Sequence, residues 1–128
     1  MIALFVTGVS WWALDSASSV VRLYLIAAHG LAAMVFLVTL GVILVLHVRE
    51  GWRLQLNRVS GVFVLTVISL LILTAFALYY VGSDILRSVV SLLHIVVGFV
   101  LPPMLVIHIV FGRRSRVRSV SLQARNIG

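Results

Sequence analysis

The chain has 128 residues, of which 62% are hydrophobic, and its mean hydropathy is +1.23. A soluble domain contains about 45–50% apolar residues, so this composition excludes water as the solvent of most of the chain. The absence of cysteine excludes disulfides, iron–sulfur clusters, thiolate metal sites and covalent c-type haem, and the net charge of +7 is spread around apolar segments rather than along one nucleic-acid-binding groove.

Three segments are long and apolar enough to cross a bilayer: Val20 to Val48, Val59 to Val81 and Ile85 to Phe111. Each exceeds the ~20 residues that a transmembrane helix needs, and none has Lys, Asp or Glu in its middle. Helices are expected because the hydrocarbon core offers no hydrogen-bond partner to an open strand edge. We therefore predict an all-α membrane protein whose transmembrane helix bundle has three full helices.

The arginines indicate the orientation of these helices. Eight of them lie on one predicted side of the membrane: Arg49, Arg53, Arg58, Arg113, Arg114, Arg116, Arg118 and Arg125. The other side receives only Arg22 and Arg87, which Asp15 and Asp84 offset. By the positive-inside rule the basic side is cytoplasmic. This predicts a multi-pass protein of a bacterial inner (cell) membrane with its C-terminus in the cytoplasm.

A weak internal repeat joins the two halves of the chain. The first copy consists of Thr7-Gly8, Trp11-Trp12, Asp15, Arg22 and His29, and the second of Thr74-Ala75, Tyr79-Tyr80, Asp84, Arg87 and His94. Each copy then ends on a second histidine, His47 or His108, just before basic residues. The repeat predicts two related helical hairpins.

On this interpretation residues 1–14 form a short N-terminal fourth helix. It is nine residues shorter than its counterpart, so either its start lies upstream or it enters only half of the bilayer. A signal peptide is the third alternative, although no basic region precedes the apolar run. We assign residues 1–113 to the bundle and residues 114–128 to a basic cytoplasmic tail. The tail is expected to be disordered from about Arg116 and to lie along anionic lipid.

All four histidines lie in or at the edge of predicted membrane helices. His29 and His47 are 18 residues apart, which is five whole helical turns, or about 27 Å. His94 and His108 are 14 residues apart, about 40° off a common face and about 21 Å apart. Because their two helices run parallel, His29 and His94 should share one depth near the outer side, and His47 and His108 another near the inner side.

Two histidines that face each other across a helix bundle are the ligands of a six-coordinate, low-spin haem. The spacing therefore predicts two b-type haems, an outer one between His29 and His94 and an inner one between His47 and His108. Each histidine should be neutral, with one ring nitrogen on iron and the other donating to a backbone carbonyl or water.

Haem propionates need cationic partners, and arginine binds a carboxylate with a two-pronged fork. Arg22 precedes His29 by seven residues and Arg87 precedes His94 by seven, which places each arginine two turns closer to the outer surface. The candidates for the inner haem are Arg49, Arg53 and Arg113. These five arginines are predicted to bind the propionates.

Small residues should flank a flat ring that lies between helices. Ala33 follows His29 by four positions and Gly98 follows His94 by four, so each lies on its histidine's side of the helix. Small residues also serve ordinary packing of membrane helices. For Gly98 we leave both roles open.

Two other interpretations of the histidines remain open. A zinc or copper transporter would gather three or four ligands at one depth, often with carboxylates or sulfur, whereas these histidines are expected in two layers. A structural or assembly subunit of a membrane complex is the alternative without metal chemistry. Because ionisable groups within lipid usually serve a function, we favour haem ligation.

The residues resemble those of bacterial di-haem b-type cytochromes. The resemblance to the cytochrome b561, formate-dehydrogenase-gamma and hydrogenase-cytochrome-b kind, especially small four-helix members, covers residues 1–113. It rests on the four histidines, on Thr7-Gly8 ahead of Trp11-Trp12, and on the helix exit from Leu46-His47 to Trp52-Arg53. The 13-residue gap between His94 and His108 resembles that of quinol-oxidising cytochrome b, but the 17-residue gap between His29 and His47 and the short first helix depart from the pattern.

The resemblance implies a membrane subunit that exchanges electrons between the quinone pool and a redox partner subunit of the dehydrogenase, iron–sulfur or cytochrome c type. The chain itself has no G-x-G-x-x-G motif or soluble domain, so it is expected to be one part of an oxidoreductase rather than a complete enzyme. Membrane lipid is a further partner, and nucleic acid is not. Candidates for a quinone contact are Trp11, Trp12, Tyr79 and Tyr80 outside and Glu50, Trp52 and Arg53 inside. The alternative role of the aromatic residues is to anchor the helix ends at the headgroup level.

Overall fold

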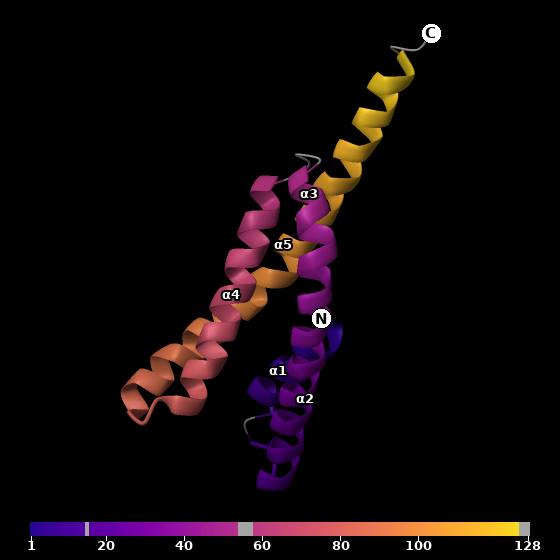
Figure 1. Cartoon of the computed structure of the whole chain (residues 1–128). Coiled ribbons are helices and arrows are strands. Elements are labelled where there is room, and N and C mark those ends of the chain that lie inside the picture. The colour runs from indigo at the N-terminus through magenta and orange to yellow at the C-terminus, as the bar shows by residue number, and fades with distance from the viewer. Residues whose placement is uncertain (15, 54–57, 126–128) are drawn as a thin grey trace. The chain divides into compact units, whose positions relative to one another are not determined.

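The structure, a computed structural model, describes residues 1–14, 16–53 and 58–125, and their side chains except at positions 48, 52–53 and 115–125. The regular structure within these ranges is entirely helical. Its elements are α1 (Ile2–Ala13), α2 (Ser19–Ile43), a π-helical segment (Leu44–Val48), α3 (Arg49–Arg53), α4 (Arg58–Tyr80) and α5 (Asp84–Arg125) (Figure 1). The prediction of an all-α protein is confirmed.

Three stretches are long and apolar enough to cross a membrane: Ser19–Gly51, Arg58–Tyr80 and Asp84–Arg114. They contain 33, 23 and 31 residues, compared with the ~20 that span a hydrocarbon core. They contain the three segments that hydropathy predicted, except that α4 stops one residue before Val81. The N-terminal helix α1 is apolar but has only 12 residues.

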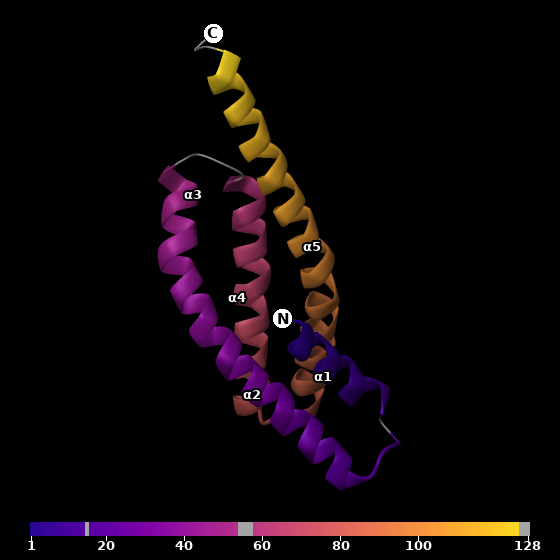
Figure 2. The same cartoon turned by 90° about the vertical axis from the view of Figure 1, so that its right-hand side faces the viewer.

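The helices form two compact units, Met1–His47 and Val48–Gly128. In the first unit α1 packs against α2, and in the second α4 packs against α5. Figure 2 shows the loop that joins α1 to α2, and Figure 1 shows the tight turn that joins α4 to α5. Short connections of this kind place consecutive helices side by side and antiparallel.

Local chemistry explains where these helices begin and end. Ser18 is the N-cap of α2, and its side-chain oxygen accepts a hydrogen bond from the Val21 backbone N–H at 3.5 Å. Asp84 lies in the first turn of α5, where a negative charge interacts favourably with the helix dipole. At the facing C-terminus of α4, Arg87 Nη2 donates to the Leu78 carbonyl at 3.2 Å, which satisfies one of the last carbonyls of the helix.

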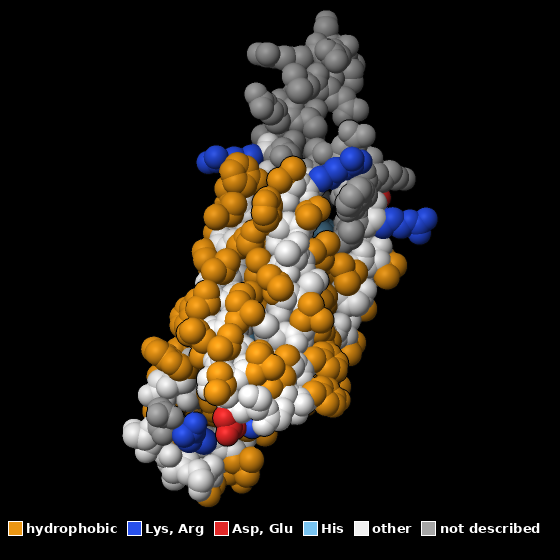
Figure 3. All heavy atoms as spheres, turned by 90° about the vertical axis from the view of Figure 1, so that its left-hand side faces the viewer, with side chains coloured by type: hydrophobic (Ala, Val, Ile, Leu, Met, Phe, Trp, Pro, Cys, Tyr) orange, Lys and Arg blue, Asp and Glu red, His pale blue; other side chains and the backbone are white. Residues whose placement is uncertain are grey.

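The most buried residues lie between α4 and α5. They are Val64, Ile68 and Thr74 of α4 and Val97 and Leu101 of α5. The large apolar side chains elsewhere on these helices are mostly exposed, and Figure 3 shows them covering the middle of the helices, with arginines near the ends. An exposed apolar surface of this extent fits a lipid environment, in which helices associate through close packing rather than through water exclusion.

Leu101 offers a test of this packing, because it is only 4% exposed. We expect Leu101→Ala to lower the free energy of unfolding in detergent by about 2–5 kcal/mol, since it leaves a cavity between two helices. Val106 of the same helix is 60% exposed, so Val106→Ala is the matched control and should change stability little. Equal effects of the two substitutions, measured by thermal or denaturant unfolding, would contradict the observed packing.

The end of α5 differs from the prediction of a disordered tail. The helix continues without a break to Arg125, so the expected disorder from Arg116 is wrong as far as that residue, and residues 126–128 lie outside the described residues. The sequence from Arg113 to Arg125 contains neither proline nor glycine, the two residues that most strongly disfavour a helix. Helix α5 also continues through Pro102 and Pro103.

The helical geometry also changes at the end of α2. His47 lies in the π-helical segment Leu44–Val48, in which each turn contains more residues than an α-helical turn. The five-whole-turn relation predicted between His29 and His47 assumes an uninterrupted α-helix, so it does not hold. Isolated π-helical turns often occur at functional sites.

Candidate functional site

His94 of α5 is held by a threonine of α4. Its Nδ1 atom lies 2.8 Å from the Thr74 hydroxyl, and Thr74 is only 6% exposed. The same hydroxyl lies 2.8 Å from the Leu70 carbonyl and 3.1 Å from the Leu71 carbonyl of its own helix. The threonine therefore connects the imidazole ring to the backbone of the neighbouring helix.

His108 has an equivalent contact at a second place along the same two helices. Its Nδ1 atom lies 2.9 Å from the Ser60 hydroxyl. The two hydroxyls are 14 residues apart on α4 and the two histidines are 14 residues apart on α5, as the antiparallel pairing requires. Both rings therefore lie along one seam.

The contacts place His94 and His108 on one side of α5, whereas an ideal α-helix would separate them by an angle. At 100° per residue, His94 and His108 would lie about 40° off a common face. The buried Leu101 lies midway between them, seven residues from each. A seam with a seven-residue repeat brings positions 14 residues apart onto the same line. The contacts of both histidines with α4 fit that repeat.

His29 in the first unit repeats the arrangement. Its Nδ1 atom lies 3.0 Å from the Thr7 hydroxyl of α1, and that hydroxyl lies 2.7 Å from the Ala3 carbonyl and 3.2 Å from the Leu4 carbonyl. Thr7 and Thr74, which were paired in the sequence repeat, thus have the same partners in their respective units.

Two glycines lie directly against the histidine rings. A Cβ atom at Gly8 would lie 3.2 Å from Cε1 and 3.5 Å from Nδ1 of His29, and one at Gly61 would lie 3.6 Å from Cε1 of His108. Each glycine follows the hydroxyl residue that contacts the same ring, in Thr7-Gly8 and Ser60-Gly61. Ser60 and Gly61 were not predicted from the sequence, and the recurrence of a hydroxyl residue before glycine is the signal that would have found them.

No protein-family model matches the sequence, and no curated protein or solved structure matches it. Its function is therefore inferred from the arrangement of its own residues. Among the residues that the structure describes, no three His, Cys, Asp or Glu side chains come together as a metal-binding group.

The fourth histidine, His47, is the last residue of the first unit and is exposed. It lies on the π-helical segment rather than on a regular α-helix. Of the small residues predicted to flank a haem, Gly98 lies nearest to Leu71 of α4, whose Cδ2 atom is 3.9 Å from the position of an added Cβ. That contact fits packing between α4 and α5. Ala33 is half-buried in α2, and its predicted place beside a haem stays a prediction.

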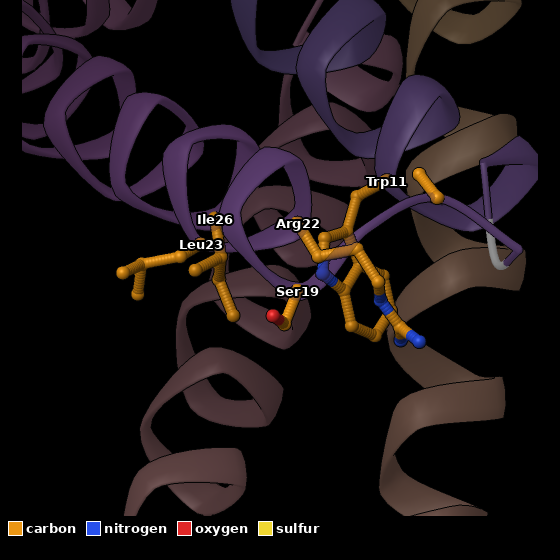
Figure 4. Close-up of a pocket in the computed structure, with 6 residues that line it drawn as sticks. Trp11, Ser19, Arg22, Leu23 and Ile26 are labelled. Atoms are coloured by element: carbon orange, nitrogen blue, oxygen red, sulfur yellow. The ribbon is translucent and has the colours of Figure 1, made fainter.

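Arg22 lies at the end of the α1–α2 pair, where the guanidinium carbon is 5.1 Å from the centre of the Trp11 ring. The two side chains border a pocket of about 460 Å³, which Ala17, Ser19, Leu23 and Ile26 also line (Figure 4). A guanidinium over an aromatic face is attracted by the negative face of the ring, which holds the arginine beside the pocket. The pocket therefore combines a cation with apolar walls.

The other predicted arginines have different surroundings. Arg87 donates to the Leu78 carbonyl, so it stabilises the end of α4, a role that its pairing with Arg22 in the sequence repeat did not predict. Arg49 and Arg113 are exposed. The side chains of Arg53 and Trp52 lie outside the described residues. None of these positions tests a contact with a haem propionate.

Aromatic residues lie at the ends of α1 and α4, as the sequence predicted. Tyr79 and Tyr80 at the end of α4 are 80% and 81% exposed, and Trp12 of α1 is 58% exposed. Tyr80 stacks on Phe76, with ring centres 6.4 Å apart. Amphipathic rings at such positions prefer the headgroup level of a membrane.

Proposed function

We propose that the chain is the membrane subunit of an electron-transfer complex and that its four histidines bind two b-type haems. His29 and His94 would hold the outer haem, and His47 and His108 the inner one. When bound, two such groups supply one-electron transfer between the two membrane surfaces. The chain's own contribution is to orient the histidine rings, surround them with apolar helices and exclude water.

The observation that carries this proposal is the shared environment of three histidines. His29, His94 and His108 each contact a hydroxyl of the preceding helix through Nδ1, at 2.8–3.0 Å. A metal-binding histidine almost always has its second nitrogen hydrogen-bonded, which fixes the orientation of the ring. The partner expected from the sequence was a backbone carbonyl or water, and a side-chain hydroxyl serves the same purpose. The donor set therefore fits a haem bound through Nε2.

The same contacts support the interpretation of the chain as two related hairpins. Thr7 with His29 and Thr74 with His94 are corresponding residues of the sequence repeat, and each pair joins the two helices of its unit. Two related hairpins would present equivalent histidines to each other and would form a bis-histidine site between them. On this proposal the haem itself joins the two units.

The distribution of charge in the second unit supports the proposed orientation in a bacterial inner membrane. Arg58, Arg113 and Arg114 lie at one end of the antiparallel α4–α5 pair, and Asp84 and Arg87 lie at the other. The positive-inside rule assigns the first end to the cytoplasm. The C-terminus would then be cytoplasmic, and the partner redox subunit could lie on either side.

Among the predicted cationic partners, Arg22 is the strongest candidate for an outer propionate. It borders a pocket beside Trp11 and precedes His29 by two helical turns. Arg87, whose Nη2 donates to the Leu78 carbonyl, is the second candidate. Arg49, Arg53 and Arg113 remain our candidates at the inner haem. A quinone would contact the aromatic residues of the outer helix ends or Glu50 and its neighbours at the inner ones.

The test is a reduced-minus-oxidised absorption spectrum of the full chain in mild detergent, with haem and protein quantified on the same sample. We expect sharp low-spin b-type bands and two haems per chain. A colourless, folded sample that takes up no added haem would overturn the proposal. That result would favour a structural or assembly subunit, and binding of zinc or copper by the same sample would favour a metal transporter.

A further inference from the structure

The contacts of Thr74 determine which nitrogen of His94 carries the proton. A hydroxyl has a single hydrogen to donate but two lone pairs. The Thr74 oxygen lies 2.8 Å from the Leu70 carbonyl oxygen, a distance at which two oxygens repel each other unless a hydrogen lies between them. The hydroxyl proton is therefore donated to the helix backbone. In the 2.8 Å contact with His94 the threonine oxygen must therefore accept, and the Nδ1–H of the histidine donates.

Thr7 has the same relation to His29. Its oxygen lies 2.7 Å from the Ala3 carbonyl, so its proton is also committed to the backbone and the His29 Nδ1–H donates to it across 3.0 Å. In both units, therefore, the neutral imidazole is protonated on Nδ1 and has its lone pair on Nε2.

We propose that Thr7 and Thr74 are positioning residues that hold His29 and His94 in the Nδ1-protonated tautomer, so that both present Nε2 to a metal. This inference rests on the proposed function for its metal, but the tautomer itself is a property of the protein alone. It distinguishes these two threonines from the other threonines of the membrane helices. Thr39 and Thr66 also donate to the carbonyl four residues before them, at 2.8 Å and 3.0 Å, but both are exposed and contact no histidine.

The hydrogen bond to each threonine should also affect the reduction potential of a metal bound by the histidine ring. An acceptor on Nδ1–H makes the imidazole a more basic ligand, and a more basic ligand stabilises the more highly charged ferric state over the ferrous state. Loss of the threonine hydroxyl should therefore raise the potential of the outer haem. The inner haem, whose ligand His108 contacts Ser60, should keep its potential.

The first experiment measures the tautomer without haem. The full chain is labelled with ¹⁵N-histidine, purified without haem at a pH where the rings are neutral, and examined by NMR, with signals assigned by single histidine substitutions. We expect His29 and His94 to be protonated on Nδ1. Thr74→Val should change the His94 signals alone, Thr74→Ser should restore them, and the control Thr66→Val should have no effect. Protonation on Nε2 in the wild type would overturn the inference.

The second experiment uses the haem-loaded chain and separates the two proposals. In Thr74→Val we expect an upward shift of one of two potentials and a haem affinity at the outer site lower by about 10- to 100-fold, with recovery in Thr74→Ser. If Thr74→Val does not fold, Thr7→Val with Thr39→Val as its control gives the same test in the first unit. Two haems with unchanged potentials would contradict the positioning role alone, whereas a chain that binds no haem but shows the Nδ1 tautomer would contradict the proposed function alone.

Discussion

Replacing His94 with alanine is expected to halve the low-spin haem bound by the chain. An iron that loses one of its two histidine ligands is no longer six-coordinate through the protein, so the outer haem should be lost or should lose its low-spin bands. The inner haem should keep its spectrum. The measurement is the reduced-minus-oxidised spectrum per mole of protein, and Leu92→Ala, at a position 64% exposed on the same helix, is the control.

Double substitutions test which histidines share a haem. Removing both ligands of one haem should lower the amount of bound low-spin haem no further than removing either one, because the effects of residues that act as a unit are not additive. We therefore expect the chain with both His29→Ala and His94→Ala to resemble each single variant, and the chain with both His94→Ala and His108→Ala to lose all low-spin haem. Full loss of haem in the first double variant would contradict the proposed pairing.

Most of the helices could be predicted from the sequence because their length and apolarity have one physical solution in lipid. A backbone surrounded by hydrocarbon must satisfy its hydrogen bonds internally, so α4 begins and ends within one residue of the predicted segment. The end of α2 could not be predicted, because a π-helical turn at His47 has no signature in hydropathy. The helical end of α5 was missed because charge and polarity were taken as signs of disorder.

The candidate site could also be predicted only in part from the sequence. The histidines could be found by residue type alone, since ionisable groups are rare within membrane helices. Their hydroxyl partners could not, because Thr74 and Thr66 look alike along the chain and only the pairing of α4 with α5 brings Thr74 to His94. The same holds for Gly98, for which the sequence left open a place beside a haem and a role in helix packing, and which lies nearest to Leu71. Contacts between residues far apart in sequence depend on helix register, which local patterns do not contain.

Gly8→Ala is expected to weaken the outer site. The added methyl group would lie 3.2 Å from Cε1 of His29, so the ring must shift by a few tenths of an ångström, which disturbs its 3.0 Å contact with the Thr7 hydroxyl. We expect haem affinity at the outer site to fall about tenfold, as for other changes in the support of a metal ligand. Binding titrations that follow the two haems separately provide the measurement.

Gly61→Ala is the matched control for this effect, because its methyl group would meet Cε1 of His108 at 3.6 Å, an ordinary contact. Both substitutions raise helix propensity by the same amount, about 1 kcal/mol, so a difference between them reports on the rings and not on the helices. The residue that corresponds to Gly8 in the second copy of the repeat is Ala75, which follows the Thr74 that contacts His94. Equal haem affinities in Gly8→Ala and Gly61→Ala would show that the His29 ring accommodates the methyl group without loss of binding.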